Sequence, residues 1–247
     1  MTSNHKTAKS PGGLPKMGCI DGSWLLETGK FSDFTVVCQN TEFRVHKAVL
    51  YPQSDSFAAL FDSNMEEVQK GVVTFDDIDP KIMKHLIDFF YSDYHEFEFD
   101  YSELKTHVEV WILADRLQAS PAMITIETRL MYHLEEYEEK EAAFYEENIL
   151  DMVFSHPACA KSIVGKIFAE TAWIVFSNEK DECSSHILTS FTKYPDLARE
   201  MLVWSRTYSK EGVSCSLAEP SGLFKDDCGR VVREEAITLT KFSKIPR

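Results

Sequence analysis

The chain has 247 residues, 44% of them hydrophobic and 12% aromatic, which is enough to bury the core of one or two domains. Its formal net charge of -14 repels phosphate groups and anionic lipid, so we expect neither a nucleic-acid nor a membrane partner. No stretch approaches the ~20 apolar residues that span a bilayer, and the N-terminus lacks the apolar region of a secretion signal. The six cysteines are therefore expected to be reduced thiols in an intracellular protein of the cytoplasm, the nucleus or both.

The first 20 residues are mainly Ser, Thr, Lys, Gly and Pro and have little apolar surface to bury. This composition predicts a disordered N-terminal tail. Residues 23–26, SWLL, form the first apolar cluster and are expected to be a short helix that leads into Gly29.

A β-hairpin is expected next. Residues 34–38, FTVVC, are β-branched and aromatic, which is typical of a half-buried strand. Residues 39–41 are polar and suit a turn. Residues 42–46 alternate, with Phe43 and Val45 on one face, so they predict the second strand.

The period then becomes helical over residues 48–51, and Pro52 is expected to end that short helix. Either Ser54 or Asp55 can cap the next helix, which buries Phe57, Leu60 and Phe61. Residues 62–70 are polar and predict a surface loop or one helical turn before a strand at 72–75.

Three longer helices should follow. The first begins at Asp79-Pro80, an N-cap followed by proline at the first helical position, and has a broad apolar face. Residues 91–100 alternate aromatic and acidic side chains and predict a loop or short edge strand. The other helices are expected to start near Ser102 and at Ser120-Pro121.

Glutamate is dense from residue 135 to 147, which we interpret as a solvated helix face rather than an acidic interaction surface. Beyond it, apolar periodicity predicts helices at 148–154, 160–176 and 195–204. Periodicity is lost after residue 205, so the last 40 or so residues are expected to be weakly structured.

Several of these segments together resemble the BTB/POZ domain. The matching blocks occur in the same order as in that family, over residues 22 to 135: GKFSD at 29–33, FRVHKAVL at 43–50, Ser54, Phe57, GVVTF at 71–75, DP at 79–80, FFY at 89–91 and VWILAD at 110–115. The similarity is greatest to the stand-alone BTB proteins of filamentous fungi.

The resemblance implies an α+β fold, with a short hairpin and a third strand covered by a helical cluster. We expect a tail at residues 1–20, the BTB/POZ domain at 22–137, an all-α extension at 138–205 and a weakly structured tail at 206–247.

In this family a histidine at the position of His46 has a structural place, and Phe57 is likewise expected to be structural. Dimerising members also carry an acid before the first strand and a base after that histidine. Asp33 and Lys47 match those positions and imply a charged pocket at a dimer interface. The alternative is that Asp33 caps the strand entry and Lys47 is solvated.

Met65 and Glu67 match a hydrophobic–x–Glu triplet that docks on the cullin in BTB adaptors of ubiquitin ligases. A flexible methionine can fill an irregular apolar pocket, and a glutamate at the rim can accept from a polar donor. The alternative is a solvated turn.

The sequence contains no catalytic motif that we identify. His107-Val-Glu109 matches half of a zinc deaminase signature, but the second half is missing, so we interpret both residues as polar helix positions. One possible zinc set combines Cys183 and His186 with two distant cysteines, Cys215 and Cys228; unrelated side chains are the favoured interpretation.

We therefore expect a non-enzymatic, cofactor-free protein-interaction module that forms a homodimer. The best specific hypothesis is a substrate adaptor for a cullin-type ubiquitin ligase, which binds a cullin scaffold and an unknown protein substrate. The alternative is an oligomerising scaffold or regulatory protein without a ligase link. A helical enzyme with an unrecognised site is a third possibility, whereas a BTB transcription factor would need a zinc-finger array that is absent from this sequence.

Overall fold

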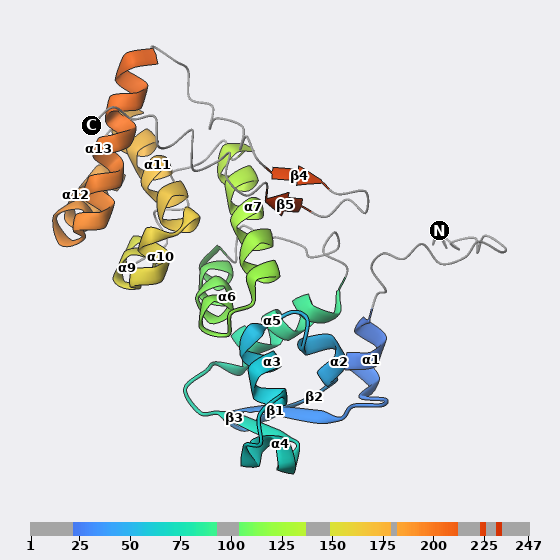
Figure 1. The fold of residues 1–247 in the computed structure, drawn as a ribbon. Coiled ribbons are helices and arrows are strands. Elements are labelled where there is room, and N and C mark those ends of the chain that lie inside the picture. The colour runs from blue at the N-terminus through green and yellow to red at the C-terminus, as the bar shows by residue number, and fades with distance from the viewer. Residues whose placement is uncertain are drawn as a thin grey trace, which may run out of the picture.

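The computed structural model describes residues 22–92, 104–136, 149–178 and 182–211, with two short strands at 223–225 and 231–233 (Figure 1). The elements up to residue 136 are α1 (Ser23–Thr28), β1 (Phe34–Cys38), β2 (Thr41–Val45), α2 (Lys47–Leu50), α3 (Asp55–Phe61), α4 (Glu66–Lys70), β3 (Val72–Phe75), α5 (Pro80–Tyr91), α6 (Leu104–Arg116) and α7 (Ser120–Glu136). The later elements are α9 (Ile149–Ser155), α10 (Pro157–Lys161), α11 (Ile163–Asn178), α12 (Glu182–Lys193), α13 (Pro195–Glu211), β4 (Leu223–Lys225) and β5 (Val231–Arg233).

A three-stranded sheet in the order β2-β1-β3 forms one end of the molecule. β1 and β2 pair antiparallel from Phe34↔Val45 to Cys38↔Thr41, which confirms the expected hairpin. Gln39 takes a positive φ of 52° in the turn, and Thr41 already belongs to the second strand. β3 then pairs parallel to β1, with Thr35 opposite Val72.

Local capping explains where the first helices begin and end. Gly29 ends α1 in the left-handed conformation at φ 59°, which glycine adopts without steric cost. Ser54 is the N-cap of α3: its Oγ accepts from the Phe57 N–H at 3.2 Å and donates to the Leu117 carbonyl. Between the two candidates, Ser54 and not Asp55 is therefore the cap.

Helices α5, α6 and α7 supply most of the core of this part. Asp79 caps α5 as expected, because its Oδ1 accepts from the Lys81 N–H at 2.7 Å. Met83, Leu86 and Ile87 on α5 are fully buried, as is Trp111 on α6. The expected fold, a small sheet covered by helices and followed by a helical C-terminal region, is confirmed. Residues 93–100, interpreted as a loop or edge strand, and 137–147 of the glutamate-rich segment lie outside the described residues.

The helix expected over 160–176 is present as α11, but it begins at Ile163, and residues 157–161 form the separate short helix α10. Ser162 between them is extended, with ψ of -179°, and its Oγ accepts from the Val164 N–H at 3.0 Å to start α11. Gly165 lies so close to α10 that an added Cβ would be 2.3 Å from the Ala160 carbonyl oxygen. The close approach of the two helices therefore requires both the break and the glycine.

The sequence analysis assigned no helix between residues 177 and 194, yet α12 occupies most of that interval. Its apolar periodicity is short, and among those of its apolar side chains that the structure describes, only Ile187 is fully buried. α13 continues to Glu211, past the expected boundary at residue 205. β4 and β5 then pair antiparallel in the segment expected to be weakly structured.

The helical extension, residues 149–211, is packed onto the preceding part and not merely tethered to it. α11 contacts α7, and both α9 and α10 contact α6. One hydrophobic core cluster consequently runs from Phe34 in the sheet to Met201 in α13. Among the described residues, no helix combines the length and apolar character needed to cross a bilayer.

Candidate protein-interaction sites

Asp33 lies immediately before β1 and joins three elements. Its backbone N–H donates to the Val45 carbonyl at 3.2 Å, which closes the hairpin. Its Oδ1 accepts from the backbone N–H of Lys47 at 2.8 Å, at the start of α2. The carboxylate therefore satisfies one of the unpaired N–H groups of a helix N-terminus, although the cap comes from a distant residue.

The ammonium group of Lys47 lies over two aromatic rings. Its Nζ is 5.3 Å from the ring centroid of Phe34 and 5.6 Å from that of Phe61. These distances are typical of cation–π contacts, which are favourable where the cation is partly desolvated. Asp33 and Lys47 thus come together as expected, but through the lysine backbone, while the half-buried Lys47 side chain covers the aromatic pair.

His46 connects α2, α5 and the segment before β1. Its backbone N–H donates to the Tyr91 hydroxyl at 2.7 Å, and its Nδ1 lies 2.8 Å from the same hydroxyl. Its Nε2 is 2.7 Å from the Lys30 carbonyl. The carbonyl can only accept, so this network assigns the proton to Nε2, and the Tyr91 hydroxyl donates to Nδ1.

The Tyr91 hydroxyl is held neutral by this environment. Burial raises the pKa of Tyr91 to about 12, and the nearby Asp33 carboxylate acts in the same direction. Its backbone carbonyl also accepts from the Gly22 N–H at 2.8 Å, next to α1. His46 and Tyr91 are therefore buried and occupied by internal hydrogen bonds, an arrangement suited to holding elements together.

Phe57 lies in the core, with 1% of its surface exposed. Its ring stacks on that of Phe61, with the centroids 5.8 Å apart, and Phe61 in turn meets Phe34 edge to face at 4.9 Å. Phe57 therefore packs against Phe61, one of the two rings that the Lys47 ammonium group contacts.

Met65 projects from a short, well-connected turn between α3 and α4. The Ser63 hydroxyl donates to the Leu60 carbonyl at 2.6 Å and accepts from the Met65 N–H at 3.2 Å. Gln69 donates from Nε2 to the Asn64 carbonyl at 3.2 Å. The side chain of Met65 nevertheless remains 57% exposed. The turn thus holds the backbone while presenting a large apolar side chain to solvent.

The two glutamates that follow Met65 differ in their surroundings. Glu66 forms an ion pair with Lys70 one turn along α4. Glu67 is exposed, and within the described part of the chain its carboxylate has no ion pair or hydrogen bond. Glu67 is therefore available to accept hydrogen bonds from another molecule.

Two exposed aromatic residues near the start of the domain were missed by the sequence analysis as surface features. Phe31 is 82% exposed and has a positive φ of 63°, and Trp24 on α1 is 47% exposed. The left-handed region costs a non-glycine residue about 1–2 kcal/mol. The sequence gives no direct signal of this exposure, because an aromatic residue beside a strand is more often part of the core.

The remaining candidates for chemistry lie partly outside the residues that the structure describes. His107 and Glu109 are positions of helix α6, as interpreted from the sequence; His107 is buried with 3% exposure, and Glu109 is half-buried. His186 is exposed on α12, while the side chain of Cys183 and both Cys215 and Cys228 lie outside the described residues. Within the described ranges, no three His, Cys, Asp or Glu side chains are grouped to hold a metal ion.

The two thiols that the structure does describe are poor nucleophiles. Burial raises the pKa of Cys38 to about 11 and that of Cys159 to about 12, so both remain protonated near neutral pH.

Part of this chain is similar to known proteins. The family model of the BTB/POZ domain matches residues 24–134. A solved structure of the BTB domain of zebrafish PATZ1 is similar with 19% sequence identity and a TM-score of 0.36, covering 44% of this chain and 84% of that chain. BTB domains are generally non-enzymatic modules that mediate protein–protein interaction and oligomerisation. The match over residues 24–134, together with the three-stranded sheet and its covering helices, identifies this part of the chain as a BTB/POZ domain.

Proposed function

We propose that this chain is a non-enzymatic adaptor that binds the cullin scaffold of a ubiquitin ligase through Met65 and Glu67 and forms a homodimer through its BTB domain. The observation that supports the cullin assignment is the position of Met65, 57% exposed at the N-cap of α4, beside the exposed Glu67, whose carboxylate has no ion pair or hydrogen bond among the described residues.

The geometry of this turn favours binding in two ways. Its backbone is held by the Ser63 hydroxyl, so little conformational entropy is lost when a partner covers it. Burying a methionine side chain in an apolar pocket contributes about 1.5–3 kcal/mol when it is complete. Because Lys70 pairs with Glu66, the carboxylate of Glu67 does not have to break an internal ion pair before it accepts from a partner.

The homodimer is supported by a different observation, the exposed Phe31 and Trp24 at the N-terminal edge of the domain. A second copy that covers Phe31 would offset the cost of its left-handed backbone. Asp33 and Lys47 lie close by in sequence, and their mutual hydrogen bond gives this edge a fixed shape.

The cullin assignment is tested by a pulldown with the full chain and its Met65→Ala, Glu67→Ala double variant. We expect the wild type to retain a cullin and the double variant to lose it. Glu66→Ala is the matched control, because it removes a neighbouring carboxylate that is already ion-paired, and it should retain the cullin. Equal retention of the cullin by the double variant, or no retention by the wild type, would contradict the proposal. The alternative function, an oligomerising scaffold without a ligase link, would then remain.

The dimer is tested separately by size exclusion with light scattering at micromolar concentration. We expect a dimer for the wild type and a monomer for Phe31→Asp, because a desolvated carboxylate in the interface is unfavourable. Gln39→Asp, at another exposed residue with positive φ, is the control and should remain dimeric. A wild-type monomer would refute the dimer and would leave the cullin test unaffected.

A further inference from the structure

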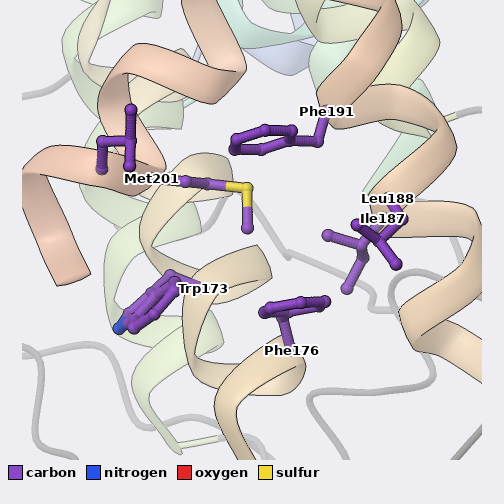
Figure 2. A pocket seen from close by; sticks show the side chains of 7 residues that line it. Trp173, Phe176, Ile187, Leu188, Phe191 and Met201 are labelled. Carbon is purple, nitrogen blue, oxygen red and sulfur yellow. The ribbon is translucent and has the colours of Figure 1, made fainter.

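An apolar groove opens between the last three helices, in a region that the BTB match does not cover. Figure 2 shows Trp173 and Phe176 of α11 facing Ile187 and Phe191 of α12, with Met201 of α13 between them. Apolar side chains from three helices therefore converge on one opening.

The groove has the size of a single large side chain. Its volume is about 140 Å³, and an apolar protein cavity of about 150 Å³ is large enough to bind benzene. Two further lining residues remain exposed, Leu188 by 49% and Leu202 by 56%. An occupant with one aromatic anchor would fill the groove, and flanking aliphatic residues would cover these leucines.

The chain itself has a segment that can reach the groove. β5 ends at Arg233 and lies against α7, and α7 packs on α11 (Figure 1). The 14 residues 234–247 follow and lie outside the described residues. Fully extended, they span about 45 Å at 3.3 Å per residue. A helix with its side chains is roughly 10–12 Å in diameter, so an extended segment of this length can cross several helices.

The composition of this segment suits the groove. The sequence EEAITLTKFSKIPR contains one aromatic residue, Phe242, with Leu239 and Ile245 three residues to either side. Its three basic residues outnumber its two acidic ones, whereas the whole chain has a net charge of -14. By contrast, residues 1–21 join the chain at α1, at the opposite end of the molecule from α12 and α13.

We propose that residues 234–247 dock on the groove of α11, α12 and α13 of the same molecule, with the side chain of Phe242 as the anchor. This inference concerns the extension and is independent of the cullin and dimer assignments.

The direct test replaces Phe242 in the full chain by a benzophenone amino acid and irradiates the protein. Benzophenone reacts readily with methionine side chains, and Met201 lies in the groove. We expect an intramolecular crosslink that mass spectrometry maps to Met201 or to the helices beside it, and a much weaker one when the probe replaces Ser243. Crosslinks to other regions, or crosslinked dimers showing that a second copy fills the groove, would overturn the proposal.

A second measurement does not depend on the probe. Hydrogen exchange of α12 and α13 should rise in Phe242→Asp and stay at the wild-type level in Ser243→Asp, which adds the same charge one residue away. Leu188→Asp, on the rim, should mimic Phe242→Asp. If hydrogen exchange of α12 and α13 is unchanged in Phe242→Asp, docking of this segment is contradicted. The groove would then be open to an external partner.

Discussion

The BTB part, residues 22–136, and the extension, residues 149–211, share one hydrophobic core but present different surfaces. In the BTB part, the two most exposed of the large apolar side chains, Phe31 and Met65, lie on short connections between elements, whereas Trp24 lies on α1. The extension instead exposes Leu188 and Leu202 on regular helices around a groove. The comparison teaches that two regions can share one buried core while the surfaces that we propose for recognition lie on separate elements.

Replacing Trp111 by Ala should break the shared core most severely. Trp111 is 1% exposed, and its Nε1–H donates to Glu127 of α7 at 3.3 Å. We expect a loss of about 3–5 kcal/mol in the free energy of unfolding. Urea denaturation followed by circular dichroism should show one transition shifted as a whole, because the extension packs on α6 and α7.

The control is Trp24→Ala, because Trp24 is half exposed on α1 and should change stability far less. If Trp111→Ala unfolds only part of the helical signal and leaves a separate second transition, the two regions do not share one cooperative core.

Substituting Gly165 tests the extension alone. An alanine Cβ at this position would lie 2.3 Å from the backbone oxygen of Ala160, so α10 and α11 must move apart. We expect about 1–3 kcal/mol of destabilisation. Hydrogen exchange should rise most in α10 and α11 and much less in β1 and β2. Wild-type stability in Gly165→Ala would show that the contact between the helices is looser than described.

Tyr91→Phe makes the corresponding test in the BTB part. The substitution removes the acceptor of the buried His46 N–H and the donor to His46 Nδ1, while keeping the ring. We expect a loss of about 1–3 kcal/mol, measured as a shift in the urea midpoint. Tyr51→Phe, whose hydroxyl bonds Asp62 at the surface, is the control and should change the midpoint little. Equal shifts in the two variants would refute the structural importance of the His46–Tyr91 pair.

Alkaline pH should lower the free energy of unfolding of both regions, by less than the substitutions described above. The pKa of Cys38 is raised from 9.0 to about 11 and that of Cys159 from 9.0 to about 12, both mainly by burial. The unfolded chain loses these protons first as the pH rises, so stability is complete below pH 9 and falls between pH 9 and 12. Urea midpoints at pH 8 and pH 10, under reducing conditions, should show this decrease, and Cys159→Ala should reduce it. A flat profile would contradict the burial of these thiols.

Much of the BTB part could be predicted because its local signals agree. The alternation of residues 42–46 predicted the strand β2, and Asp79-Pro80 predicted the start of α5. The break at Ser162 could not be predicted, because it depends on how closely α11 passes the carbonyl of Ala160. α12 was missed because its periodic apolar stripe is too short to be distinguished from a loop.

The contacts at the candidate sites likewise could not be predicted from the sequence. The proximity of Asp33 and Lys47 and the structural place of His46 followed from the family resemblance, but the individual contacts of these residues did not. No pattern in the sequence indicates that Asp33 bonds the Lys47 backbone while the ammonium group lies over Phe34. Such contacts depend on where β1, α2 and α3 meet in space.

The most direct measurement of the central claim is calorimetric titration of the purified full chain with a purified cullin scaffold. We expect saturable binding that weakens about 10- to 100-fold in the Met65→Ala, Glu67→Ala double variant, since a total loss of about 1.4 to 2.8 kcal/mol over the two contacts changes the Kd by that range. Glu66→Ala should bind like the wild type. No heat of binding for the wild type, or the same Kd for the double variant, would contradict the account.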